Sequence, residues 1–121
     1  MNNKYYEMGQ QIANFRKKKS ISCSEFAKSI GISTAYLSQL ERGIRLHPDS
    51  KLISKIARAL DLSNEESTYL FDLYAMQTRQ LPPDITEYLI GNSGVQSALR
   101  KARDANATEE DWERFIEKLK K

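Results

Sequence analysis

The chain has 121 residues, a formal net charge of +3 and a single cysteine. This length predicts one domain, or one small domain with an appendage, and it allows a core without disulfide or metal staples. A single cysteine excludes an internal disulfide and fits a reducing compartment. The first ten residues contain no apolar run, and no stretch approaches the roughly 20 apolar residues of a membrane span. We therefore expect a soluble cytoplasmic protein with no membrane contact.

The charge is divided unevenly along the chain. Residues 1–60 contain 11 Lys and Arg against 4 Asp and Glu, a net charge of +7. Residues 61–121 contain 8 against 12, a net charge of −4. The basic first half predicts contact with nucleic acid and leaves the acidic second half for a different role.

The first predicted helix covers residues 5–19, with Met8, Ile12 and Phe15 on its apolar side. It ends in the basic run Arg16–Lys19. Cations at a helix C-terminus are favoured by the macrodipole, and they are equally suited to contact phosphates. Both explanations remain open for the lysines.

Residues 22–43 predict two short helices around a tight turn. Ser22 and Glu25 have the spacing of a capping box, Gly31 allows the left-handed conformation that ends a helix, and Ser33 is a second N-cap. The face of the second helix opposite its apolar side consists of Ala35, Ser38, Gln39 and Arg42, with Thr34 at its edge. This face is short, polar and uncharged in its first two turns. Such a face suits base edges, because Gln can bond adenine bidentately and Ser can bond either type of base.

The run YLSQLERG, residues 36–43, is the most specific part of a wider pattern that extends to Pro48. The pattern resembles the helix-turn-helix of lambda-repressor-like (Xre/Cro-type) transcription regulators over roughly residues 6–72. The resemblance implies that the second helix enters the DNA major groove. With that helix in the groove, its polar face is expected to read bases through four residues: Thr34, Ala35, Ser38 and Gln39.

Contacts with the DNA backbone are expected as well, and for Arg45 the resemblance implies one. These are expected from Lys17, Lys18, Tyr36, Arg42 and Arg45. The family usually has Gln directly after the cap of the first of the two helices, where this chain has Cys23, so a thiol stands at a backbone-contacting position. In the family an Arg at the position of Arg16 pairs with a Glu at the position of Glu41, so we expect a partly buried structural pair.

Two further helices complete the predicted bundle, over residues 50–60 and 63–77. Asp49 or Ser50 caps the first, and Ser63 with Glu66 forms a capping box for the second. The expected fold is all-α, a five-helix lambda-repressor-like DNA-binding bundle with a short helical C-terminal extension. We place the DNA-binding domain at residues 1–78 and the extension at residues 79–121.

The extension begins near the pair Pro82-Pro83, which disfavours helix. Helices are predicted over residues 84–90, capped by Asp84, over residues 95–105, and from Thr108 onward, with residues 91–94 as a turn or hinge. The last helix carries an apolar stripe at the spacing i, i+3, i+4, i+7: Trp112, Phe115, Ile116 and Leu119. This stripe packs on the bundle itself or on a second subunit, and we favour dimerisation.

Catalytic chemistry is not indicated. Cys23 and His47 are single and lie on different predicted elements, so we expect no enzyme activity, no cofactor and no metal site. A helix N-terminus can depress the pKa of a thiol, but Cys23 has no resolving partner within the chain. The sole histidine is best explained as a surface loop residue.

Two functions follow from these observations. The first is a sequence-specific transcriptional regulator, in particular a repressor that binds double-stranded DNA at a palindromic operator as a homodimer. The alternative is an antitoxin-like or switch protein whose C-terminal helices bind a protein partner, such as an antirepressor or a toxin. The two functions are compatible, since a partner on the tail could release the DNA.

Overall fold

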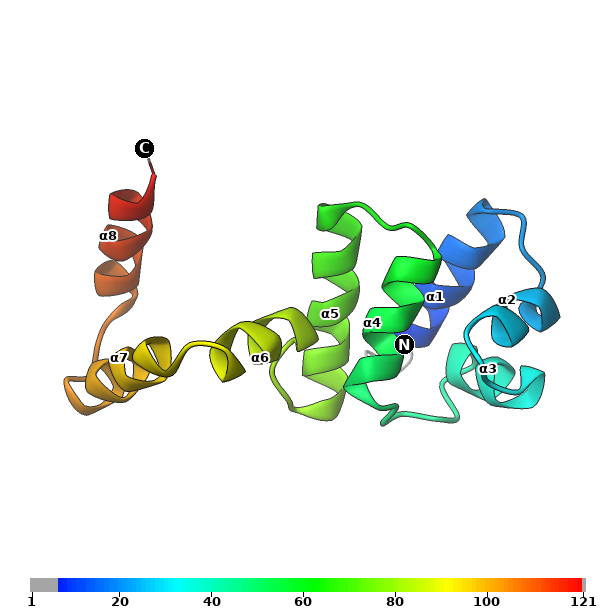
Figure 1. The fold of residues 1–121 in the computed structure, drawn as a ribbon, viewed down its shortest axis with the longest axis horizontal. Helices are drawn as coiled ribbons and strands as arrows, with labels where there is room; N and C mark the ends of the chain where they lie inside the picture. Colours follow the sequence, from blue (N-terminus) through cyan, green and yellow to red (C-terminus); the bar gives the residue numbers. More distant parts are fainter. Residues whose placement is uncertain (1–6, 121) are drawn as a thin grey trace. The chain divides into compact units, whose positions relative to one another are not determined.

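The computed structural model describes residues 7–120, in which helices are the only regular secondary structure and no strand occurs (Figure 1). Eight helices follow one another within this range: α1 (Glu7–Lys18), α2 (Cys23–Ser29), α3 (Thr34–Glu41), α4 (Ser50–Ala59), α5 (Asn64–Thr78), α6 (Pro83–Ile90), α7 (Ser93–Asp104) and α8 (Glu109–Leu119). The predicted start of the first helix, at residue 5, lies outside the described residues.

Side-chain caps explain where most of these helices begin. The hydroxyls of Ser22 and Ser33 accept hydrogen bonds from backbone N–H groups three residues later, at 3.1 Å and 3.0 Å. At α5 the full capping box is present, because Glu66 also accepts a hydrogen bond from the backbone N–H of Ser63 at 2.9 Å. The box predicted at α2 is only half formed: the carboxylate of Glu25 accepts a hydrogen bond from the Ser22 hydroxyl, at 3.2 Å.

The core lies among α1 to α5. Helix α1 packs against α3 and α5, α2 packs against α3, and α4 packs against α5. Fifteen apolar residues are buried there: Met8, Ile12, Phe15, Phe26, Ala27, Ile30, Leu37, Leu40, Ile53, Ile56, Ala57, Leu60, Leu70, Leu73 and Tyr74. The tightest approach is at Gly9, where an added Cβ would lie 2.2 Å from the carbonyl oxygen of Leu40. The absence of a side chain at Gly9 lets α1 pack directly on the end of α3.

Two predicted boundaries in the extension are wrong. Helix α6 begins at Pro83 and not after a cap at Asp84, because proline at the first helical position loses only a donor that would be unsatisfied anyway. Helix α7 begins at Ser93, because the carbonyl of Asn92 already accepts from the N–H groups of Val95 and Gln96. The predicted hinge over residues 91–94 is therefore reduced to Gly91 and Asn92.

The chain divides into two compact units at Thr86 and Glu87, inside α6, whereas the sequence placed a boundary after residue 78. In the second unit, neither α7 nor α8 contains a buried residue. A groove of about 490 Å³ runs between these two helices and is lined by Val95, Leu99 and Phe115 among others. Within residues 7–120, no helix is long and apolar enough to cross a membrane.

Candidate nucleic-acid interface

Helix α3 has one buried side and one open side. Leu37 and Leu40 are completely buried against the core. On the other side Thr34 and Ala35 are exposed, while Ser38 and Gln39 are partly exposed. The four predicted base-reading residues thus share an accessible surface whose side chains are small or carry neutral polar groups.

The end of α3 is held by Arg16 and Glu41. The Arg16 Nε donates to Glu41 Oε2 at 2.8 Å, and its Nη2 donates to Glu41 Oε1 at 2.9 Å. A third hydrogen bond runs from Arg16 Nη1 to the carbonyl of Ile21, at 2.9 Å. The hydrogen bonds with Glu41 raise the pKa of Arg16, against the opposing effect of its burial. Arg16 therefore joins α1, the segment before α2 and α3 through one side chain.

Beyond α3 the chain turns sharply through Gly43, which has φ = 77°. The N–H of Ile44 donates to the carbonyl of Gln39 at 2.8 Å, and the N–H of Gly43 donates to that of Leu40 at 3.2 Å. These two bonds form a Schellman motif. The loop that follows is fixed from the far side, where the buried amide Nε2 of Gln77, on α5, donates to the carbonyl of Leu46 at 2.7 Å.

The turn brings Arg45 back over the open side of α3. Its Nε donates to Gln39 Oε1 at 2.9 Å, and its guanidinium carbon lies 5.4 Å from the centre of the Tyr36 ring. The backbone N–H of Arg45 also donates to the carbonyl of Gln39, at 3.2 Å. From the sequence, Tyr36, Gln39 and Arg45 were expected to make separate contacts. No signal in the chain reveals their association, because it depends on the direction of the side chain after the Schellman turn.

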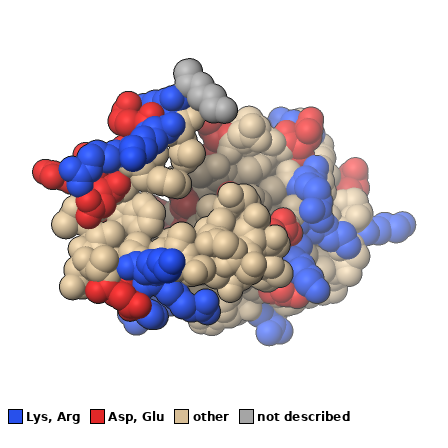
Figure 2. Space-filling model, turned by 60° about the vertical axis from the view of Figure 1, so that its left-hand side comes forward, with Lys and Arg blue, Asp and Glu red and all other residues tan. Residues whose placement is uncertain are grey.

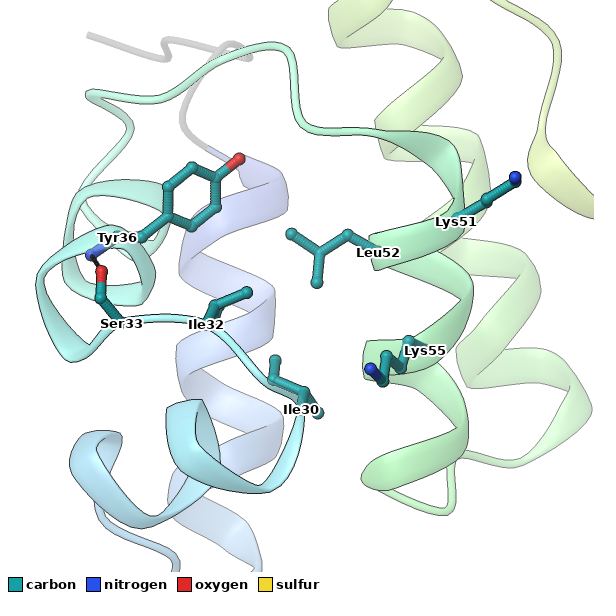
Figure 3. Close-up of a pocket in the computed structure, with 7 residues that line it drawn as sticks. All are labelled: Ile30, Ile32, Ser33, Tyr36, Lys51, Leu52 and Lys55. Atoms are coloured by element: carbon teal, nitrogen blue, oxygen red, sulfur yellow. Dashed lines mark hydrogen bonds between the residues drawn. The ribbon is translucent and has the colours of Figure 1, made fainter.

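A shallow pocket of about 510 Å³ lies between the start of α3 and the start of α4 (Figure 3). Ile32, Tyr36 and Leu52 contribute apolar side chains to it, and Lys51 and Lys55 line its α4 side (Figure 3). The pocket thus places two cations beside the N-terminal end of the open side of α3.

The other predicted contact residues lie at different places around α3. Lys17 and Lys18 are exposed at the end of α1, and Arg42 is exposed at the end of α3, where its Nε lies 3.4 Å from the carbonyl of Ser38. Cys23 is half-buried, and burial together with the charge of Glu41 raises the pKa of its thiol.

The apolar stripe of α8 is the remaining predicted set. The exposed fractions are 37% for Trp112, 52% for Phe115, 52% for Ile116 and 62% for Leu119. The rings of Trp112 and Phe115 meet edge to face, with their centres 6.1 Å apart. Figure 2 shows that Lys and Arg side chains lie beside Asp and Glu side chains on the face in view. Within the described residues, no group of three or more His, Cys, Asp or Glu side chains is placed to hold a metal ion.

Comparison with known proteins agrees with this geometry. A family model described as helix-turn-helix matches residues 12–66. The transcriptional regulator SinR of Bacillus subtilis is 38% identical over 56 residues, which are 46% of this chain and 50% of SinR. The regulator SlrR of the same organism is 29% identical over 114 residues, 94% of this chain and 68% of SlrR. The regulator YazB, also from that organism, is 41% identical over 58 residues, 48% of this chain and 83% of YazB.

These matches place α2 and α3 inside the shared segment. The chain belongs to the helix-turn-helix family of DNA-binding transcriptional regulators, of the lambda-repressor-like (Xre) type. The part of the chain that matches SinR spans about half the length of SinR. The similarity to SlrR continues into the second unit.

Proposed function

We propose that this chain is a transcriptional repressor that binds a palindromic operator as a homodimer, with α3 in the major groove. The observation that carries the proposal is the open side of α3, where Thr34, Ala35, Ser38 and Gln39 are accessible on a helix fixed through Glu41. Small hydroxyl and amide side chains are the groups that read base edges. A regulator of this kind acts in the cytoplasm, on DNA, and performs no catalysis.

The positive charges around α3 supply affinity for any sequence. Lys17, Lys18, Arg42 and Arg45 are exposed, and each phosphate that they neutralise releases counterions. Tyr36, at the edge of the open side, adds a phenol that orients the helix on the backbone. Cys23, which is half-buried at the start of α2, is the remaining residue that we assign to contact with the DNA backbone.

The second part of the chain supplies the dimer in this proposal. We retain residues 1–78 as the DNA-binding domain and residues 79–121 as the dimerisation element. The stripe of Trp112, Phe115, Ile116 and Leu119 is exposed in the isolated chain, and such a contiguous apolar surface marks an interaction site. A two-fold dimer presents two recognition helices one DNA turn apart, about 34–36 Å.

A protein partner on the same surface is the second candidate. The observation in its favour is the acidic character of the second half, which serves no purpose in binding DNA. An antirepressor or a toxin that covers the α8 stripe would compete with a second copy of the chain. In that case the partner would release DNA by separating the dimer.

Selection of binding sites from random duplex DNA tests the first part of the proposal. We expect a palindromic motif. Gln39→Ala should weaken binding to that motif by about 1–3 kcal/mol and relax the preference at one base pair in each half-site. Lys17→Ala should weaken binding to all sequences alike and lower the salt slope by roughly one. If no motif emerges, the protein is not a sequence-specific regulator.

Sedimentation equilibrium tests the dimer. The double variant Phe115→Ser, Ile116→Ser should be monomeric. It should bind half-sites with unchanged base preference, because both residues are more than half exposed and lie outside the core of α1 to α5. Tyr69→Ser is the matched control, since Tyr69 is 46% exposed on α5. A dimer that persists in the double variant and is lost in the control would place the interface on α5.

A further inference from the structure

Arg45 and Gln39 form one unit in the structure rather than two independent contacts. Arg45 is attached to Gln39 twice, by its backbone N–H at 3.2 Å and by its Nε at 2.9 Å. The face of Tyr36 supports the guanidinium from below, at 5.4 Å. Stacking of a guanidinium on an aromatic ring is favourable, so the side chain of Arg45 is held in place before any ligand arrives.

This attachment fixes the orientation of the Gln39 amide and occupies one of the two acceptor sites of its oxygen. A carboxamide has an oxygen that accepts and an NH₂ group that donates twice. The Nε–H of Arg45 can bond only the oxygen, so the amide cannot flip without losing that hydrogen bond. Within residues 7–120, neither donor of the NH₂ group makes a hydrogen bond, and a positive charge lies beside the oxygen.

The two purines respond differently to such a group. Bidentate recognition of adenine needs the amide oxygen to accept from the N6 amino group while the NH₂ donates to N7. Guanine presents two acceptors, O6 and N7, at the same positions. A cation beside the amide repels the amino group of adenine and attracts the acceptors of guanine.

We propose that Arg45 is a specificity-determining residue that converts Gln39 from a reader of adenine into a reader of guanine. The NH₂ of Gln39 donates to a guanine acceptor in each half-site, and the remaining N–H groups of Arg45 are directed to the same edge or to the adjacent phosphate. This inference rests on the proposed function, because it requires α3 to lie in the major groove. It differs from a plain phosphate contact, which carries no sequence information.

The test starts from the base pair at which Gln39→Ala relaxes the preference. Duplexes with guanine or adenine at that position are compared for the parent, Arg45→Ala, Gln39→Ala and the double variant. The parent should favour guanine by about tenfold, which corresponds to about 1.4 kcal/mol. Arg45→Ala should remove the preference for guanine or reverse it in favour of adenine. The double variant should have the same guanine-to-adenine ratio as Gln39→Ala alone.

Arg42→Ala is the matched control, since Arg42 is also an exposed arginine at the end of α3 but bonds the backbone of Ser38 and not the side chain of Gln39. It should lower affinity for both duplexes equally. Arg45→Lys keeps the charge but lacks the planar guanidinium that stacks on Tyr36, so it should retain the salt dependence of binding and only part of the preference for guanine.

Two results would overturn the inference. If Arg45→Ala weakens binding to both duplexes equally and leaves the ratio unchanged, Arg45 acts only on phosphate. If the parent selects a motif with adenine at this position, the amide of Gln39 is free to use both ends. In both cases the selected motif itself remains, so the proposed function stands. A parent protein that selects no motif refutes that function together with the inference.

Discussion

Helices α4 and α8 have the same kind of amphipathic pattern and different fates. On α4 the apolar residues Ile53, Ile56 and Ala57 are at most 4% exposed, because α5 packs against them. On α8 the stripe residues are between 37% and 62% exposed. The comparison shows that periodicity predicts which side of a helix is apolar, whereas the burial of that side depends on a neighbouring element. The first unit supplies that element from its own chain, and in our proposal the second unit takes it from another copy.

The largest effect is expected from Arg16→Ala, which removes the central ion pair of the first unit. The variant leaves the carboxylate of Glu41 without its two hydrogen bonds and the carbonyl of Ile21 without its donor. Removing one partner of a buried pair costs about 3–5 kcal/mol, and we expect the lower end because both side chains retain slight exposure. Urea unfolding measures the loss, with the exposed Arg58→Ala as control. Equal midpoints for Arg16→Ala and the parent would contradict this role.

Two glycines give a direct contrast between the units. Gly9→Ala would bring a methyl group within 2.2 Å of a backbone oxygen, so the α1–α3 contact must open, at an expected loss of about 1–3 kcal/mol. Gly94 in α7 has no atom within 4 Å of an added Cβ, so Gly94→Ala should be neutral or stabilise α7 by up to about 1 kcal/mol. Thermal unfolding of both variants measures the difference. Similar losses would mean that α7 is as tightly packed as α1.

A smaller effect is expected at acid pH, where the caps of α5 and α8 can be compared. Hydrogen bonding from the backbone of Thr108 lowers the pKa of Asp111, and bonding from Ser63 lowers that of Glu66. Each cap therefore stabilises its helix above the unfolded pKa and loses this contribution as the pH falls through the lower folded pKa, below about 4. Amide exchange should show α8 fraying first, because α5 is also held by α1 and α4. Simultaneous fraying would contradict this order.

The smallest effect concerns Cys23 in the first unit. Burial raises the pKa of its thiol, so less thiolate is present at neutral pH than in an unfolded chain. Alkylation by iodoacetamide should be slower in the native protein than in urea, and the difference should narrow as the pH rises. Faster alkylation of the native protein would contradict this expectation and indicate that the N-terminus of α2 lowers the pKa of the thiol.

The sequence predicted those features that depend on neighbours in the chain. The caps at Ser22, Ser33 and Ser63 are local patterns of hydroxyl and backbone N–H, and they were located to the residue. Features that depend on distant segments were not predicted. Gly9 gives no sign that α3 will pass within contact distance of it, and the bond from Arg45 to Gln39 requires the direction in which the chain leaves the Schellman turn.

The hydrogen bond from Gln77 to the carbonyl of Leu46 has a consequence for protein engineering. A chimera that transplants only the matched segment, residues 12–66, would omit Gly9 on one side and Gln77 on the other. The loop that carries Arg45 would then have lost its anchor, and the new host would set the spacing between α1 and α3. A portable module must therefore extend from the start of α1 through the end of α5, and swapping operator preferences between relatives requires exchange of that whole frame.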